Sequence, residues 1–248
     1  MQVEIGFGTH QGRRRTTNQD TVGIFEARGL FRQRYEWPFM VVADGMGGHR
    51  GGAVASHIAV QAAGKTYQRA TKSTAADEVL LAAVMAANQA VVDKATNTPA
   101  LDGMGTTIVA ALIDGDTVHI ANVGDSRGYV IRGEEIEQIT DDHSLIADQV
   151  RAGVISKEQA AVAIGRNVIT RALGRHEALE VDIFSVDWQI GDVLVLCTDG
   201  LWGQVADLQI LTVVQELDVQ AAVEQLTQLA LRSQAPDNVG VIVARRSE

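Results

Sequence analysis

Four aspartates lie where apolar runs of the sequence begin or end. Asp44 and Asp199 each follow such a run and precede a glycine, Asp125 follows another run, and Asp237 comes just before the last one. Antiparallel strands can bring their starts and ends to one edge of a sheet, so we expect the four carboxylates to converge. Converging carboxylates repel one another unless a cation lies among them, and oxygen ligands suit Mg²⁺ or Mn²⁺. A single Asp-Gly pair is typical of a turn, so the prediction depends on the four together.

A basic segment, residues 9–20, joins the first two strand-like runs and contains Arg13, Arg14 and Arg15. The planar guanidinium of an arginine can bind two oxygens of a phosphate at once. Three consecutive arginines are also typical of a solvated turn, so the segment alone does not establish a phosphate site. Together with the aspartates, the basic segment indicates a site where cations and an arginine bind the same phosphate group.

Composition excludes several other classes of protein. The chain has 248 residues, 46% of them hydrophobic, and a formal net charge of −10, which disfavours nucleic-acid binding. Its single cysteine, Cys197, permits no internal disulfide. Neither a signal peptide nor an apolar run near the roughly 20 residues of a membrane span is visible. We therefore expect a cytoplasmic protein, monomeric, with no nucleic-acid or membrane partner.

The elements that must position these residues are mostly strands. Val-, Ile-, Phe- and Leu-rich runs bounded by turns predict strands, and the turns at 114–116 and 133–134 favour antiparallel hairpins. The predicted strands are 3–7, 21–25, 39–43, 107–113, 118–123, 128–132, 181–186, 193–198 and 239–243. Apolar periodicity predicts helices at about 52–67, 75–95, 208–216 and 219–232. Thr74 with Asp77 resembles a capping box at the start of the second helix.

Strands that alternate with helix pairs predict an α+β layered fold in one domain, residues 1–248. The less regular stretch at about 142–166 is interpreted as a small helical flap inserted in that domain. Residues 59–66 fit a relaxed P-loop pattern, but they continue a helix instead of following a strand, so we do not expect phosphate there. Cys197 ends a strand, and core packing is its expected role rather than that of a cysteine phosphatase nucleophile.

The order of the motifs resembles that of a known family, the PPM-type metal-dependent protein phosphatases (protein phosphatase 2C family), in their compact bacterial branch. The matching segments span nearly the whole chain. They are Gly12-x-x-Arg15-x-x-Asn18-Gln19-Asp20, Asp44-Gly45-Met46-Gly47-Gly48-His49, Met104-Gly105-Thr106-Thr107, Val123-Gly124-Asp125-Ser126-Arg127, Thr140-x-Asp142-His143, Cys197-Thr198-Asp199-Gly200-Leu201 and Asp237-Asn238-Val239. Each segment is weak alone, and their shared order makes the resemblance specific.

The resemblance implies a four-layer αββα sandwich of two antiparallel sheets flanked by helix pairs. It also implies two to three Mg²⁺ or Mn²⁺ ions per chain. In that pattern Asp44 bridges two cations, the carbonyl of Gly45 binds one of them, and Asp199 and Asp237 bind the other. Asp125, with Asp199, matches the third cation position of the bacterial branch.

The implied activity is hydrolysis of phosphoserine and phosphothreonine by direct attack of a metal-bridging hydroxide, without a phosphoenzyme. Arg15 matches the phosphate-binding arginine, Asp20 supports the site directly or through water, and Asn238 acts behind it. His49 is a candidate general acid or, alternatively, a residue that orders its loop. The neutral Gln19 stands where many members carry an acid.

The resemblance further implies phosphorylated protein substrates, produced by a bacterial serine/threonine kinase. Two alternatives stay open at this stage. One is a catalytically weak relative that binds phosphoproteins or acts as a scaffold, and the other is an enzyme for a nonprotein phosphoester. The metal-dependent chemistry does not itself require a protein substrate.

Overall fold

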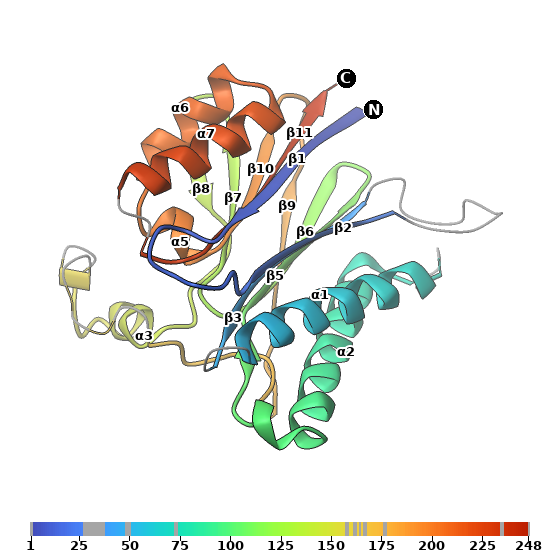
Figure 1. The fold of residues 1–248 in the computed structure, drawn as a ribbon. Coiled ribbons are helices and arrows are strands. Elements are labelled where there is room, and N and C mark those ends of the chain that lie inside the picture. The colour runs from blue at the N-terminus through green and yellow to red at the C-terminus, as the bar shows by residue number, and fades with distance from the viewer. Residues whose placement is uncertain are drawn as a thin grey trace.

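Two antiparallel sheets lie face to face in the middle of the molecule, and a pair of helices covers each outer face (Figure 1). This computed structural model describes residues 2–26, 38–47, 51–71, 74–156, 159–160, 163, 165, 168–175, 178–233 and 236–247. The arrangement confirms the predicted α+β class and the four-layer αββα sandwich.

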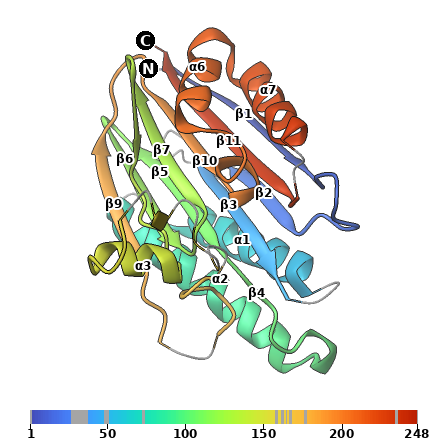
Figure 2. The same ribbon diagram turned by 90° about the vertical axis from the view of Figure 1, so that its left-hand side faces the viewer.

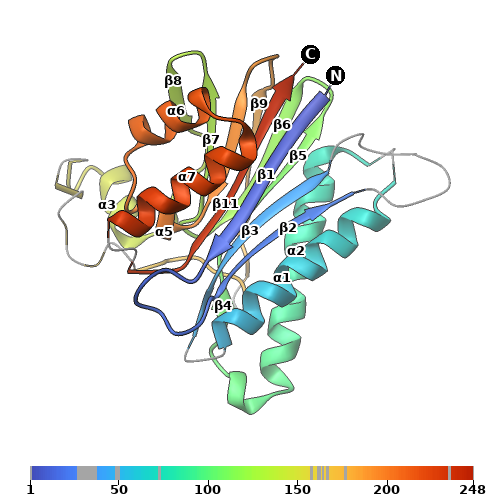
Figure 3. The same ribbon diagram turned by 45° about the horizontal axis from the view of Figure 1, so that its top comes forward.

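The first sheet holds both ends of the chain. Its strand order is β1 (Gln2–His10), β11 (Val239–Ser247), β10 (Val193–Cys197), β7 (Arg127–Arg132) and β8 (Glu135–Gln138). The first and last strands pair antiparallel from Gln2 opposite Ser247 to His10 opposite Val239. The two termini therefore lie side by side at one end of the sandwich (Figure 3).

The second sheet pairs its strands antiparallel throughout. Its order is β2 (Asp20–Phe25), β3 (Phe39–Met46), β5 (Ile108–Asp114), β6 (Thr117–Val123) and β9 (Asp182–Asp187), and the short β4 (Gly105–Thr106) pairs with β3. Asp114 pairs with Thr117 across the predicted turn, and Arg132 with Glu135 across the other. Both predicted hairpins are therefore confirmed.

The helices form the two outer layers (Figure 2). α1 (Gly51–Arg69) and α2 (Ala76–Thr96) lie on the second sheet, and α6 (Asp207–Glu216) and α7 (Val219–Arg232) lie on the first. A short α5 (Asp199–Trp202) follows β10 directly, η1 (Pro99–Leu101) follows α2, and α3 (Leu145–Arg151) projects from the sandwich. α3 falls in the predicted flap, of which residues 157–158, 161–162, 164 and 166 lie outside the described residues.

Three apolar cores separate the four layers, and the alternation of side chains along the strands explains them. In β3, Phe39, Val41 and Ala43 face α1 and α2, whereas Met40 and Val42 pack in the core between the sheets. A third core lies between the first sheet and α6 and α7. Strands that are buried on both faces have continuous apolar sequences, and this is why they could be predicted from the sequence.

Helix α2 is long and apolar enough, by length and composition, to cross a membrane, which the sequence analysis did not anticipate. Val79, Leu80, Ala83, Val84 and Ala87 are nevertheless buried in the core between this helix, α1 and the second sheet. Packing against α1 and the second sheet accounts for these five apolar residues.

The predicted capping box at the start of α2 is wrong. The N-cap is Ala75, which makes no side-chain cap hydrogen bond. Because the helix begins one residue later than predicted, Thr74 precedes the cap, and its amide donates to the carbonyl of Thr71 in a turn. Asp77 contacts Nδ1 of His119 on β6 at 2.5 Å instead of turning back to the helix start. The short strands β4 and β8 were not predicted.

Candidate metal and phosphate site

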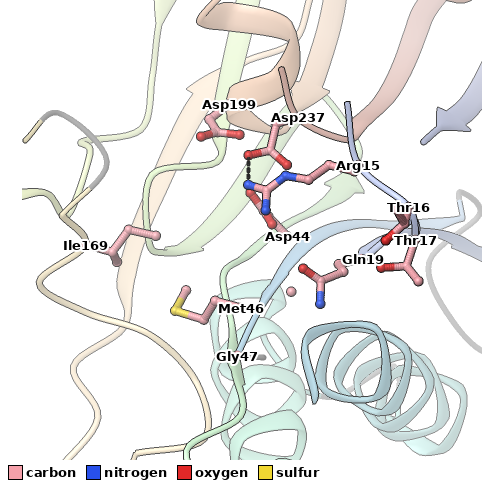
Figure 4. A pocket seen from close by; sticks show the side chains of 11 residues that line it. Arg15, Thr16, Thr17, Gln19, Asp44, Met46, Gly47, Ile169, Asp199 and Asp237 are labelled. Carbon is pink, nitrogen blue, oxygen red and sulfur yellow. Dashed lines mark hydrogen bonds and ion pairs between the residues drawn. The ribbon is translucent and has the colours of Figure 1, made fainter. Parts of the chain in front are cut away.

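The register of the two sheets brings the predicted residues to one edge. Asp20 at the start of β2 lies opposite Asp44 near the end of β3. In the other sheet, Asp199 follows the end of β10, and Asp237 precedes the start of the neighbouring β11. Strand starts and strand ends therefore meet as expected, and Asp44, Asp199 and Asp237 point into one cavity (Figure 4).

The cavity has a volume of about 360 Å³. Its lining is polar on the side of the aspartates and the basic segment, and Met46 and Ile169 provide an apolar wall opposite them (Figure 4). The lining residues are Arg15, Thr16, Thr17, Gln19, Asp44, Gly45, Met46, Gly47, Ile169, Asp199 and Asp237.

The backbone of Asp44 is fixed by two threonines from the neighbouring β4–β5 segment. The amide of Asp44 donates to Oγ1 of Thr107 at 2.9 Å, and its carbonyl accepts from Oγ1 of Thr106 and from the amide of Thr107, both at 2.8 Å. These hydrogen bonds hold the chain while the carboxylate faces the cavity. The residue types are visible in the Met104–Thr107 motif, but their role depends on strand pairing.

Gly45 is required by a close approach between β3 and the start of α1. A side-chain Cβ at this position would lie 2.0 Å from the carbonyl oxygen of Gly52, which no real contact allows. The amide of Gly45 also donates to the carbonyl of Gln19 at 3.1 Å. The glycine that follows Asp44 thus lets three segments meet at the cavity.

Several buried carboxylate oxygens lack a hydrogen-bond partner among the described residues. Oδ1 of Asp20, of Asp125 and of Asp199 is in this position, although Oδ2 of Asp20 accepts from Thr198 at 2.8 Å. Buried polar atoms without partners are uncommon in folded proteins and cost about 1–3 kcal/mol each. Their concentration at one edge indicates a ligand that supplies positive charge.

The raised pKa values of the aspartates at the site also indicate a ligand that supplies positive charge. Burial, and then the nearby Asp199, raises the pKa of Asp20 to about 8. Burial followed by the charge of Asp199 raises the pKa of Asp125 to about 7, and burial followed by Asp237 raises that of Asp199 to about 6. The pKa of Asp44 is also raised, by burial and then by Asp20. Carboxylates this close resist ionisation unless a cation joins them.

The donor set therefore fits hard divalent cations, which take carboxylate and carbonyl oxygens. Among the described residues, no cluster of three or more His, Cys, Asp or Glu side chains already encloses a cation position. Asp237 is instead paired with Arg15, whose Nη2 lies 2.5 Å from Oδ2 of Asp237. Both side chains of this ion pair are partly exposed.

Arg15 is the arginine of the basic segment that reaches the cavity. Its side chain is 50% exposed, and its hydrogen bond to Asp237 raises its pKa. Asn238 holds the segment in place, because its Nδ2 donates to the carbonyls of Gln11 and Thr17, and its Oδ1 accepts from the amide of Gln19. Arg13 and Arg14 are not in the cavity lining.

Three predicted residues that the structure describes, Asp20, Asp125 and Asn238, do not line the cavity. Asp125 is buried beside Asp199 but does not line the cavity. His49 lies outside the described residues. Sequence reasoning missed Thr16, Thr17 and Ile169 in the lining, and only the first two, as hydroxyls in the basic segment, carried any signal.

The αββα sandwich, with carboxylates and an arginine meeting at one edge of its sheets, defines the class of metal-dependent phosphatases. A family model described as protein phosphatase 2C matches residues 7–238. The serine/threonine phosphatase stp of Listeria innocua is 41% identical over 206 residues, which are 82% of this chain and 79% of that protein. The protein phosphatase PhpP of Streptococcus pneumoniae is 32% identical over 250 residues, covering 99% of this chain and 98% of PhpP.

A solved structure shows the same likeness over the whole fold. The catalytic domain of the serine/threonine protein phosphatase PstP, crystallised in complex with two manganese ions, superposes with a TM-score of 0.85 at 34% identity. The superposition covers 99% of this chain and 99% of that domain. The chain belongs to the protein phosphatase 2C family.

Proposed function

We propose that this chain, a metal-dependent serine/threonine protein phosphatase by family, binds its cations through Asp44, Gly45, Asp199 and Asp237, with a further cation between Asp125 and Asp199. The observation that carries the proposal is the group of buried carboxylate oxygens without partners at the edge where Arg15 enters the cavity. No ion pair within the described part of the chain accounts for these oxygens.

Divalent cations, when bound, would acidify water and neutralise charge on the phosphoryl oxygens. The protein's own part is to hold the phosphate and to keep the carboxylates in place. Arg15 carries a guanidinium at the cavity wall, paired with Asp237. A phosphoryl group that enters the cavity competes with Asp237 for this donor and gains a charge-assisted contact in return.

Asp20 and Asn238 would hold the cation ligands and Arg15 in place without lining the cavity themselves. Asp20 is buried and accepts from Thr198, so we propose that it orients the site rather than contacts the substrate. Asn238 ties the Arg15 segment to the start of β11 through hydrogen bonds of 2.8 and 3.0 Å. We propose His49 as the proton donor to the leaving oxygen, on its sequence position in the Asp44–His49 motif.

We propose Mg²⁺ or Mn²⁺ as the cation, two to three per chain. Both ions accept sites made only of oxygen ligands. The PstP structure was obtained with two manganese ions, which supports occupancy of at least two positions in that protein. Isothermal titration of metal-free protein with each ion would give the number bound and the preferred metal.

The decisive test is hydrolysis of a phosphothreonine peptide with Mn²⁺, with Mn²⁺ plus EDTA, and with the Asp199→Ala protein. We expect turnover only in the first condition. Equal turnover by Asp199→Ala would overturn the metal assignment. No turnover by the wild-type protein with several phosphopeptides and either metal would favour a phosphoprotein-binding role, and Gln19, a neutral residue in the cavity lining, would then be replaced by glutamate first.

The substrate class is phosphorylated protein, and we propose that a serine/threonine kinase of the same cell produces these substrates. The relatives named phosphatases of this type come from bacteria such as Listeria and Streptococcus. A comparison of phosphoproteins from cells with and without the active enzyme would identify the substrates. Faster hydrolysis of a small aryl phosphate than of every phosphopeptide would point to a nonprotein substrate.

A further inference from the structure

Trp202 links the two aspartates that flank the proposed third cation. It is the last residue of α5, the short helix whose first residue is Asp199. Its indole Nε1–H donates to the backbone carbonyl of Asp125 at 2.9 Å. One side chain therefore connects the helix that carries Asp199 to the turn that carries Asp125.

The indole ring is itself held from the other side. The guanidinium carbon of Arg127 lies 3.6 Å from the ring centroid, a cation–π distance. Arg127 in turn makes a two-pronged contact with Asp142, with Nε–Oδ1 at 2.9 Å and Nη2–Oδ2 at 2.7 Å, and its Nη1 donates to the hydroxyl of Tyr129 at 3.0 Å. Fixed in this way, the ring has little freedom to move away from Asp125.

A second contact holds the residue before Asp125. The amide of Gly124 donates to Nδ1 of His143 at 3.0 Å, and Nε2 of His143 contacts Oδ2 of Asp182 at 2.9 Å. The backbone at 124–125 is thus held by Trp202 on one side and by His143 on the other. The carboxylate of Asp125 is treated differently, since its buried Oδ1 has no partner among the described residues.

We propose that Trp202 is a positioning residue for the cation between Asp125 and Asp199. Its hydrogen bond sets the separation of the two carboxylates, and the contacts of Arg127 keep the ring in place. Outer-shell partners of this kind orient the ligands of a metal without touching it. The inference depends on the proposed function, because it assumes that Asp125 and Asp199 bind a cation.

The test is cation binding by metal-free protein, measured by isothermal titration with Mg²⁺ and Mn²⁺ and independent of turnover. Trp202→Phe keeps a ring beneath Arg127 but removes the N–H that Asp125 accepts. We expect it to keep the number of cations and to weaken the one that requires Asp125 by about tenfold. Trp188→Phe is the matched control, because Trp188 is fully buried at the opposite end of β6 and its Nε1 has no partner among the described residues.

Asp125→Asn separates failure of this inference from failure of the proposed function. If Asp125→Asn binds as many cations as the wild type, the assignment of Asp125 is wrong. If Asp125→Asn loses one cation but Trp202→Phe binds all of them with wild-type affinity, Trp202 has only a structural role and the inference is wrong. An equal loss of affinity in Trp188→Phe would overturn it as well.

Fluorescence provides a second measurement if Trp202→Phe does not fold. The sequence has three tryptophans, so a protein with Trp37→Phe and Trp188→Phe retains Trp202 alone. We expect its emission to change on titration with Mg²⁺, and we expect this change to disappear when Asp125→Asn is added. An emission that does not respond, or that responds equally with Asp125→Asn, would contradict the inference.

Discussion

Two buried aspartates at opposite ends of the first sheet have opposite environments. Asp192 is 2% exposed and Asp125 is 3% exposed. Asp192 precedes β10 and accepts from Arg132 at 3.0 and 2.7 Å and from the amide of Gln189 at 2.8 Å. Asp125 precedes β7, which pairs antiparallel with β10, and its Oδ1 has no partner among the described residues.

The difference separates structural from functional carboxylates. A buried charge is expensive unless it is paired and hydrogen-bonded, and the chain satisfies that requirement at Asp192 with its own arginine. At the edge of the sandwich that carries the cavity, Asp20, Asp125 and Asp199 each keep an oxygen with no partner among the residues that the structure describes. Since all these residues belong to one fold, burial alone does not explain the contrast. We expect the carboxylates with an unpartnered oxygen to bind a cation, whereas Asp192 already has Arg132 as its partner.

The largest expected effect comes from removing a carboxylate at the functional end. We expect Asp199→Asn to lower phosphopeptide turnover by more than the 10- to 100-fold typical of outer-shell partners of a metal. The metal-free variant should be no less stable than metal-free wild type, because it removes one of several carboxylates that repel each other. Turnover assays and urea unfolding in EDTA measure the two effects. A large loss of stability would place Asp199 with the structural carboxylates.

The next test compares two arginines, Arg15, which pairs with Asp237 at the cavity, and Arg132, which pairs with Asp192 at the other end. Arg15→Lys keeps the charge but loses the planar fork, and we expect kcat/KM to fall by about 100-fold, in the range reported for the loss of one transition-state donor. Arg132→Lys is the control, and its activity should remain that of the wild type. If both variants lost activity equally, the contrast between the two ends would not hold.

A smaller effect is expected at the structural end. Asp192→Asn weakens charge-assisted hydrogen bonds to Arg132, and we expect the free energy of unfolding to fall by about 1–3 kcal/mol. Turnover per folded molecule should not change. Urea unfolding and peptide hydrolysis on the same sample distinguish these outcomes, and a selective loss of turnover with wild-type stability would contradict the structural assignment.

The sequence predicted most of this fold because its strands are buried on both faces. Continuous apolar runs such as 39–43 and 193–198 have no other plausible place than a covered sheet, and the turn residues at 114–116 fixed a hairpin. The short strands β4 and β8 were missed because a few residues carry no periodic signal. The capping box at Thr74 was wrong because the helix start depends on tertiary contacts, here that of Asp77 with His119.

The site was predictable where its residues belong to local motifs. Asp44, Asp199 and Asp237 meet at one cavity as the strand ends suggested. Other parts of the site join residues far apart in the chain. Ile169 lines the same cavity as Asp44, Asn238 donates hydrogen bonds to the basic segment, and Trp202 donates one to Asp125. Such links depend on the register of the strands, which a single sequence does not specify.

The smallest expected effect is on the pH dependence of stability without metal. Burial raises the pKa of Asp20 to about 8 and that of Asp125 to about 7, against about 3.9 for an aspartate in an unfolded chain. Between these values the folded state binds more protons than the unfolded state, so stability is greatest at low pH and is lost as pH rises toward 8.

We therefore expect the urea midpoint of EDTA-treated protein to fall between about pH 5 and pH 8, and the fall to diminish in Asp125→Asn. Asp192→Asn is the control at the other end of the sheet, where Arg132 donates two hydrogen bonds to the carboxylate. Saturating Mg²⁺ should flatten the slope in the wild type, since a cation compensates the same charges at any pH in this range. A slope that is identical in Asp125→Asn and wild type would mean that the unpartnered carboxylate has no energetic cost, and the contrast between the two ends would then be one of geometry alone.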